Sequence, residues 1–194
     1  MPILDLMRSR RSVRSYKPDP LTEEQIKQII EAGCLAPSAH NYQPWRFIVI
    51  TDRDTINRLS FSAQGYLKSR TEGSDALSYF GSQERLDRVK ERLEFKEDTV
   101  FYGAPCLVLV VAEKGNEYAE MDIGMACQNM CLYAREQGIG SCVVGYARHC
   151  DREEILSVGM KDNQELIFGI TFGYSDDMDG KGVNRDFDKI QSRI

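Results

Sequence analysis

Four arginines and two serines fall within seven residues near the amino terminus, in the run Arg8-Ser9-Arg10-Arg11-Ser12-Val13-Arg14. The run reverses the sign of a chain whose formal net charge is −5. A guanidinium offers planar donors for bidentate contacts to an oxyanion, and a hydroxyl adds a short donor at close range. These residue types at this spacing are suited to binding a phosphate group.

The arginine run by itself also fits the solvated end of a helix, and because short motifs often mislead, the two interpretations have about even weight. A second segment, Ala36-Pro37-Ser38-Ala39-His40-Asn41-Tyr42-Gln43-Pro44-Trp45, follows one helix later and changes that balance. Asn41 stands among proline, tyrosine and tryptophan, where a polar side chain needs a hydrogen-bond partner. We expect Trp45 to anchor the core and His40 to lie in a surface loop. Together the segments indicate a phosphorylated, aromatic cofactor.

The six cysteines could in principle bind a metal, but their spacing argues against it. Cys127 and Cys131 stand at i, i+4, yet the chain has no Cys-x-x-Cys pair and only two histidines. We expect free thiols that act as small buried hydrophobic residues. Gly138-x-Gly140 is too short for a dinucleotide fingerprint, so the sequence shows no motif for a tightly held dinucleotide. Asp122, a charge within an apolar helix, is expected to pair with an arginine and has no catalytic role.

Helical and strand patterns alternate along the chain, which predicts helices packed on a sheet. Thr22 and Gln25 form a capping box before an amphipathic helix at Glu23–Cys34. A helix at Glu117–Gln137 is apolar nearly all round, should lie inside the protein or in an interface, and ends at Gly138. Strands are expected at Phe47–Ile50, Cys106–Ala112, Ser141–Tyr146 and Leu166–Tyr174, with a short helix capped by Asp151 and Glu154.

The middle of the chain, from about residue 55 to residue 96, is charged and mostly helical in pattern. Its clearest helix is predicted at Arg85–Phe95, where Leu86, Val89 and Leu93 recur at helical spacing. Residues 64–81 are polar and contain three glycines and several serines. The sequence leaves open whether they form a mobile lid or a loop.

Length and composition restrict the class of protein. A chain of 194 residues with 42% hydrophobic content suits one globular domain, taken as residues 1–194. A pI near 5.2 argues against nucleic acid as a partner, because the phosphate backbone requires a broad basic face. The longest apolar run, Cys106–Ala112, is too short to span a membrane, and the start does not resemble a signal peptide. We expect a cytoplasmic enzyme.

With these elements placed, the chain resembles the nitroreductase family nearly from end to end. The motifs in the first half are Arg10-Arg11-Ser12-Val13-Arg14, Ala36-Pro37-Ser38 with Asn41 and Gln43-Pro44-Trp45, and Gly103-Ala104-Pro105. Those in the second half are Asp122, Gly124, Gln128 and Asn129, then Gly138-Ile139-Gly140-Ser141, then Phe172-Gly173-Tyr174. Their order and spacing carry the resemblance. It implies an α+β class with three layers, a central mostly antiparallel sheet flanked by helices, and an intertwined homodimer.

The resemblance also implies FMN as the cofactor. Arg10, Ser12 and Arg14 would hold its phosphate and ribityl chain, with backbone contacts from Arg11. The partner subunit would contribute Pro37, Ser38, Ala39 and Asn41. The strand through Val143, Val144 and Gly145 would pass near the isoalloxazine, with a backbone N–H close to N5. Arg185 would return to the phosphate, where the family usually has Lys-x-Arg or Arg-x-Arg and this chain has Val183-Asn184-Arg185.

The activity that the resemblance implies is a ping-pong transfer of hydride from NAD(P)H, through FMN, to a nitroaromatic, a quinone or a similar small electron-poor acceptor. Reduction places negative charge near N1 and O2 of a flavin, so nearby cations or aligned N–H groups stabilise the reduced form. Two alternatives stay open. One is a related flavin enzyme for reductive dehalogenation or desaturation of a specific metabolite. The other is a flavin-binding protein without enzymatic activity.

Overall fold

The computed structural model describes residues 1–94, 98–180, 185–187 and 189. Phe95, Lys96, Val183 and Asn184, which entered the predictions above, lie outside the described residues. The described elements are α1 Ile3–Ser9, α2 Glu23–Cys34, η1 Ala39–Asn41, β1 Arg46–Ile50, α3 Arg53–Glu72, α4 Ala76–Phe80, α5 Gln83–Leu93, β2 Cys106–Glu113, α6 Ala119–Glu136, β3 Gly140–Val144, η2 Gly145–His149, α7 Arg152–Ser157 and β4 Gln164–Gly173, where η marks a 3-10 helix.

The four described strands form one sheet in the order β1-β2-β4-β3, and neighbouring strands are antiparallel. β2 pairs on both sides, which satisfies its backbone groups and allows its residues Cys106–Ala112 to be fully buried. The predicted antiparallel sheet is confirmed, and each strand begins and ends within two residues of its prediction.

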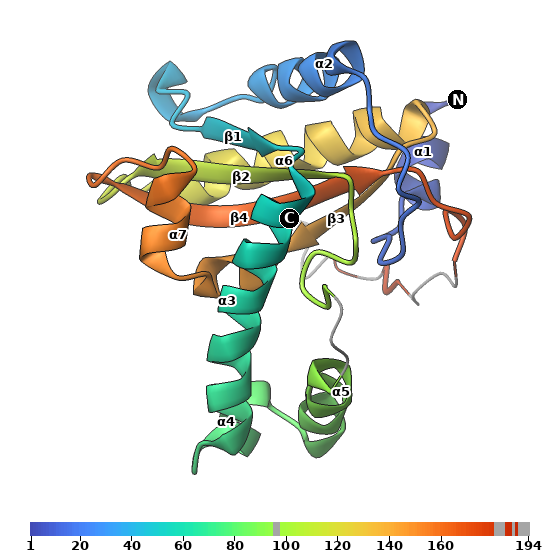
Figure 1. Cartoon of the computed structure of the whole chain (residues 1–194). Helices are drawn as coiled ribbons and strands as arrows, with labels where there is room; N and C mark the ends of the chain where they lie inside the picture. The colour runs from blue at the N-terminus through green and yellow to red at the C-terminus, as the bar shows by residue number, and fades with distance from the viewer. Residues whose placement is uncertain (95–97, 181–184, 188, 190–194) are drawn as a thin grey trace.

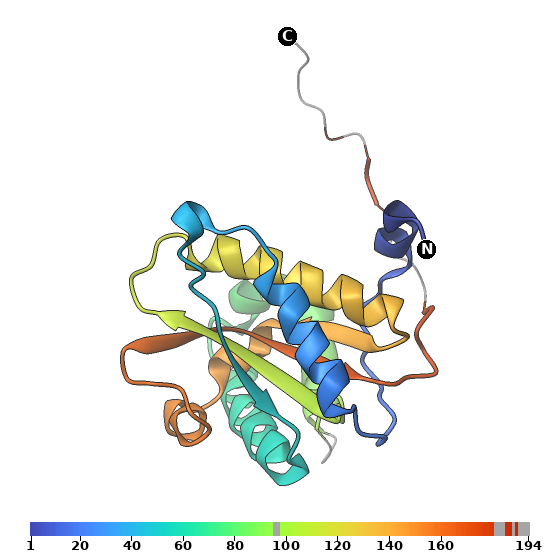
Figure 2. The ribbon, with the colours of Figure 1, turned by 90° about the horizontal axis from the view of Figure 1, so that it is seen from above.

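Helices cover both faces of the sheet, so the chain folds as three layers (Figures 1 and 2). Side chains alternate along β2, so Val108 and Val110 enter a core with α2 and α6, whereas Leu107 and Leu109 enter a second core with α3 and η2. Trp45 lies in the first core at 4% exposure, as predicted. The α+β class with a three-layer arrangement is confirmed.

The layer of α2 and α6 follows from local sequence signals. α2 begins at the predicted capping box, where Thr22 Oγ1 accepts from the Gln25 N–H at 3.2 Å and Gln25 Oε1 accepts from the Thr22 N–H at 2.9 Å. α6 is largely buried against α2 and the sheet, as expected for a helix that is apolar nearly all round. A Cβ on Gly33 of α2 would lie 2.9 Å from Met130 Cγ, so glycine permits this close packing.

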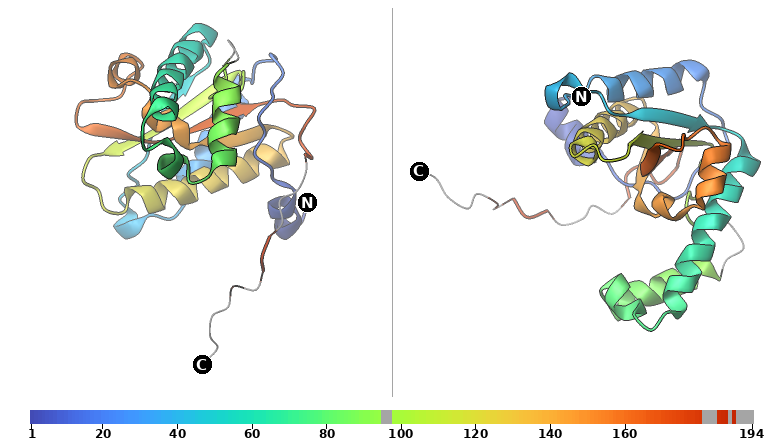
Figure 3. Two further views of the ribbon diagram at one scale, coloured as in Figure 1. Left: turned by 90° about the horizontal axis from the view of Figure 1, so that it is seen from below. Right: turned by 90° about the vertical axis from the view of Figure 1, so that its left-hand side faces the viewer.

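Residues 64–81 are mostly helical, so they do not form a loop, one of the two structures that the sequence left open. α3 continues to Glu72 and α4 follows, so that α3, α4 and α5 project from the sheet as an arm (Figures 1 and 3). The arm is helical because Ala63, Leu67 and Thr71 bury one face of α3. Its far end has a small core of its own, made by Ala76, Phe80, Leu86 and Val89.

The smaller elements differ partly from prediction. α1 was not predicted, and it exposes Ile3, Leu4 and Met7, each between 47% and 68%. α7 begins directly after Asp151, but the Asp151 side chain makes no capping hydrogen bond, so the predicted cap is wrong. Among the helices that the structure describes, none is long and apolar enough to cross a membrane.

Candidate cofactor site

The segment that follows α1 runs along the beginning of β3. The N–H of Val13 donates to the carbonyl of Ser141 at 3.0 Å, and Ser12 forms an isolated parallel bridge with Ser141. A Cβ on Gly140 would lie 2.9 Å from Val13 Cγ2, so a side chain at this position would force the two apart. Glycine at position 140 therefore lets the arginine-rich segment approach the sheet.

Tyr16 fixes the same segment against β4. Its hydroxyl lies 3.0 Å from the carbonyl of Val13 and 2.8 Å from Thr171 Oγ1. Burial raises the pKa of Tyr16 well above its ordinary value of 10, so the hydroxyl stays protonated. Only the first part of the arginine run is a helix end: Arg10 is the C-cap of α1, and the chain from Ser12 onward is held by the sheet.

Arg14 lines a hollow of about 800 Å³ beside β3. Val143, Val144 and Gly145 line the same hollow, so the fold brings together four of the residues predicted for one cofactor. Arg14 Nη1 donates to the carbonyl of Ser12 at 3.3 Å, which holds the side chain along its own segment. Aromatic and basic side chains from the arm and from η2 complete the wall.

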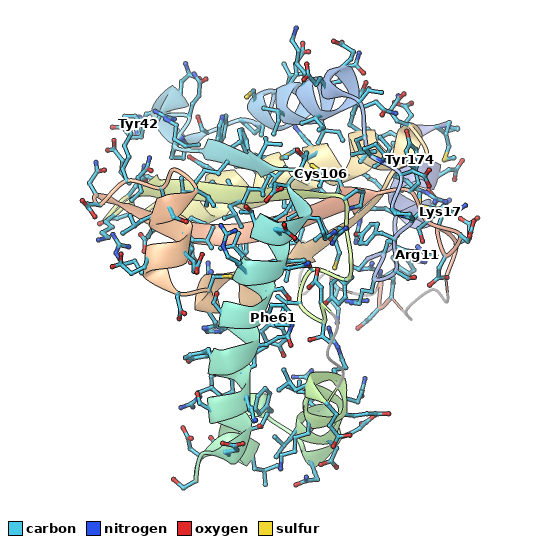
Figure 4. All side chains as sticks on the ribbon, in the orientation of Figure 1. Arg11, Lys17, Tyr42, Phe61, Cys106 and Tyr174 are labelled. Carbon is cyan, nitrogen blue, oxygen red and sulfur yellow. The ribbon has the colours of Figure 1, made fainter. Side chains whose placement is uncertain are left out.

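The other predicted cations lie elsewhere. Arg11 donates through Nε to the carbonyl of Gly180 at 3.3 Å and through Nη1 to the carbonyl of Arg10 at 2.9 Å. Figure 4 shows Arg11 on the same side of the molecule as Lys17. Arg10 is half-buried, and Ser12 and Arg185 are exposed. Arg14 is the member of the predicted phosphate set that lines the hollow.

The second predicted segment, with Pro37, Ser38, Ala39 and Asn41, forms a turn between α2 and β1. The fully buried carboxylate of Asp122 accepts the N–H of Ala39 with both oxygens, at 3.1 and 3.3 Å. The predicted pairing of Asp122 with an arginine is wrong for the residues that the structure describes, since a backbone N–H takes that place. Ser38 Oγ accepts from the N–H of Gln43 at 3.0 Å, which closes the turn.

This turn holds its backbone in an uncommon conformation. His40, Asn41 and Gln43 have φ values of 50°, 58° and 46°. A left-handed conformation costs a residue other than glycine about 1 kcal/mol or more, and it persists only where surrounding contacts impose it. The contacts of Asp122 and Ser38 supply that restraint. His40 is exposed, as predicted, and Asn41 Oδ1 accepts from Gln43 Nε2 at 3.0 Å.

The two predicted cofactor segments do not meet within one chain. Ala39 is bonded to Asp122 near the beginning of α6, whereas Ser9 Oγ accepts from Arg135 Nε at 3.2 Å near its end. At the rise of an α-helix, these two points on α6 lie about 20 Å apart. Figure 4 shows Tyr42 and Arg11 on opposite sides of the molecule. Within one chain the two predicted segments therefore lie at opposite ends of α6.

Sequence reasoning missed most of the wall that faces β3. Arg85, Arg88 and Arg92 of α5 line the hollow. Their i, i+3, i+7 spacing is visible in the sequence, but only the apolar positions of that helix were used for prediction. Tyr102 also lines the hollow, with φ of 61°, and nothing in the local sequence indicates it. Asp98 shapes its turn by accepting the Phe101 N–H at 2.7 Å.

His149 of η2 joins the hollow to the arm. Its ring stacks on Tyr66 with centroids 4.1 Å apart, and the Tyr79 hydroxyl lies 3.2 Å from Nε2. Burial, with help from the charge of Arg148, lowers the pKa of His149 and favours the neutral ring.

Cys106, Cys127, Cys131, Cys142 and Cys150 are buried packing residues, as predicted. Five of the six are buried, and Cys34 is exposed. Burial raises the pKa of Cys106, Cys127 and Cys150 to about 12, so these thiols stay protonated. In the part of the chain that the structure describes, no three His, Cys, Asp or Glu side chains gather as a metal site would require.

The sequence and the fold match an established class of oxidoreductase. A model of the Nitroreductase family matches residues 7–174, so the chain belongs to the nitroreductase family. The resemblance inferred from the sequence motifs is confirmed, and so is the class of enzyme.

Individual relatives are more distant. A 4-nitrobenzoate reductase from Pseudomonas putida is 26% identical over 87% of this chain and 83% of its own. An iodotyrosine deiodinase from Thermotoga neapolitana is 27% identical over 90% of this chain and 89% of its own. Among solved structures, a nitroreductase with bound FMN from Desulfitobacterium hafniense DCB-2 has a TM-score of 0.82 and 26% identity, and the match covers 99% of this chain and 98% of that one.

Proposed function

We propose that this protein is an FMN-dependent oxidoreductase that works as a homodimer and passes electrons from a nicotinamide nucleotide to a small electron-poor acceptor. The observation that supports this most is the hollow that Arg14 shares with Val143, Val144 and Gly145. Family membership and the FMN in the structural relative agree with FMN as the cofactor.

The residues present fit FMN. The cofactor needs a cation for its phosphate, and Arg14 supplies one. It also needs donors at the ring edge. The carbonyl of Ser141 points away from β4 toward Val13, and peptide groups alternate along a strand, so the N–H of Val143 faces the same free edge. The volume of about 800 Å³ falls in the range of cofactor sites.

When bound, FMN supplies the redox chemistry, accepting a hydride from the donor and giving electrons to the acceptor. The chain's own residues bind and orient it. Arg14 would hold the phosphate, and the edge of β3 would hold the ring through Val143 and Gly145. The aromatic side chains of Tyr79 and Phe80 restrict the access of water to the same space.

The homodimer is part of the proposal, because one chain keeps the turn at residues 37–41 about 20 Å from the arginine segment along α6. A second copy would supply Pro37, Ser38, Ala39 and Asn41 to the flavin. Arg10, Ser12, Arg11 and Arg185 would then complete the surroundings of the phosphate. The apolar side chains that α1 exposes are suited to cover by a partner subunit.

The donor in this proposal is NADH or NADPH, and the acceptors are nitroaromatics, quinones or similar compounds. A second candidate is reductive dehalogenation of a specific metabolite, which the deiodinase relative at 27% identity favours. Both candidates use the same flavin site, so they differ only in the acceptor.

Stopped-flow spectroscopy of the purified protein tests the proposal. The protein should be yellow, should bleach when mixed anaerobically with NADH or NADPH, and should regain its colour with a nitroaromatic or a quinone. Recovery with a halophenol and release of halide would favour the second candidate. A yellow protein that neither nucleotide bleaches would refute both. Light scattering should give the mass of a dimer, and a monomer that retains FMN would refute the shared site.

A further inference from the structure

One face of α5 directs its charge into the hollow beside β3. Arg85, Arg88 and Arg92 lie one helical turn or two apart and all line this space. Arg14 and Arg148 face them from other elements, and the described residues that line the hollow include no Asp or Glu. A chain of net charge −5 therefore concentrates five guanidinium groups around one cavity.

Two of these guanidinium groups already have firm partners. Arg92 donates to the carbonyl of Thr99 and lies over the ring of Tyr102, 5.2 Å from its centroid. Arg148 donates to the carbonyl of Ile167 at 2.5 Å and pairs with Glu120 at 2.6 Å. These contacts hold both side chains in the wall of the hollow.

The other two on α5 are available to a ligand. The guanidinium of Arg85 has no hydrogen bond or ion pair with any residue that the structure describes. Arg88 pairs with Glu84 at 2.6 Å, but the two side chains are 64% and 78% exposed. A surface pair four residues apart on a helix contributes only about 0.3–0.5 kcal/mol, so a bound anion can displace it.

The space between these cations and β3 is lined by flat side chains. Tyr79 and Phe80 come from α4, at the far end of the arm, and Tyr146 and Phe168 line the same hollow from η2 and β4. Aromatic walls with a cationic rim suit a planar molecule that carries a negative charge at one end.

We propose that Arg85 and Arg88 bind an anionic group, a carboxylate or a phosphate, on the planar co-substrate that enters this hollow. The inference rests on the proposed function, and it specifies in addition that the co-substrate carries a negative charge. Arg14 and its segment suffice for the phosphate of the cofactor, whereas α5 is a separate element with separate cations. The anion has two sources: the extra phosphate that distinguishes NADPH from NADH, or a carboxylate on the acceptor.

Calorimetric titration with benzoate and benzamide tests the charge preference directly, because these unreactive probes are similar in size and differ in charge. Benzoate should bind the flavin-loaded protein at least about tenfold more tightly, the effect of one charge-assisted hydrogen bond. The double variant Arg85→Gln, Arg88→Gln should remove that difference. The matched control is Lys90→Gln, since Lys90 is an exposed cation of the same helix that does not line the hollow; it should keep the difference.

Steady-state kinetics on the same variants separate the two sources. A rise in KM of the double variant for NADPH but not NADH assigns α5 to the donor. A rise for 4-nitrobenzoate but not 4-nitrobenzamide assigns it to the acceptor. The proposal is overturned if charge affects neither the probes nor these KM values, or if the double variant loses FMN while Lys90→Gln keeps it. Calorimetry works without flavin, so a colourless protein would refute the proposed function and still report on the anion site.

Discussion

The bond between Asp122 and Ala39 offers a direct test of how the turn at residues 37–41 is held. Asp122 is fully buried, and both of its oxygens accept one N–H, at 3.1 and 3.3 Å. Asp122→Asn keeps the size of the side chain but replaces an acceptor oxygen with an amide NH₂ that faces another donor. A hydrogen bond to a charged group contributes about 1.5–3 kcal/mol. We expect the free energy of unfolding to fall by about 2 kcal/mol.

Urea unfolding and thermal melting measure this loss. For a chain of this size, a change of 1 kcal/mol shifts Tm by about 2–4 °C, so a decrease of about 4–8 °C is expected. Glu136→Gln is the control, because it removes an exposed carboxylate from the other end of the same helix. Since the proposed dimer uses this turn at the partner's flavin, Asp122→Asn should also weaken FMN retention.

Two results would contradict this reasoning at different points. If Asp122→Asn melted at the same temperature as Glu136→Gln, the bond to Ala39 would not hold the turn. If stability fell but FMN affinity did not change, the bond would support the fold alone. The turn would then have no place in the cofactor site, and the argument for a shared flavin would fail with it.

Three further predictions concern the cofactor segment and the core. Arg14→Ala should weaken FMN binding about tenfold or more in a fluorescence titration, because a charge-assisted contact is lost. The control Arg8→Ala removes an exposed cation of the same run and should leave FMN binding unchanged. Gly140→Ala should lower the free energy of unfolding by about 1–3 kcal/mol, since its Cβ would lie 2.9 Å from Val13 Cγ2, and an unchanged urea midpoint would disprove the close approach. Burial raises the pKa of Cys127 from 9.0 to about 12, so the unfolded chain loses this proton first. The stability that the thiol contributes is complete below pH 9 and falls as the pH rises toward 12, by up to about 1.4 kcal/mol per pH unit; Cys127→Ala should flatten the decline measured between pH 9 and 10.

The fold was predictable where its determinants are local. The capping box at Thr22 begins α2 where predicted, and the run of apolar residues at Cys106–Ala112 forms the central strand. α6 is buried because few of its residues are charged. The sequence could not show whether the Asp151 side chain bonds to the start of α7, because the spacing of Asp151 to Glu154 does not determine where that side chain points.

The site was predictable only in part, because its contacts join distant parts of the chain. The resemblance assigned Arg14 and Val143–Gly145 to one cofactor, and the structure places them around one hollow, where the bridge from Ser12 to Ser141 brings their segments together. The partner of Asp122 lies 83 residues away and is a backbone N–H, which no residue pattern reveals. An arginine was the natural expectation for a buried carboxylate, since side-chain charge is visible in a sequence and an unsatisfied N–H is not.

The arm is where the sequence was least informative, and the same feature bears on specificity. The polar composition of residues 64–81 left a lid or a loop open, but one apolar face through Ile56, Leu59, Ala63 and Leu67 makes α3 a regular helix. A regular arm fixes the rotation of α5, because Leu86 and Val89 must enter its small core. The arginines at the remaining positions are thereby directed at β3. Charge that looks like a solvated helix face in the sequence thus becomes the wall of a cavity. If the anion site proposed above is correct, the packing of Leu86 and Val89 would determine which co-substrates that cavity favours.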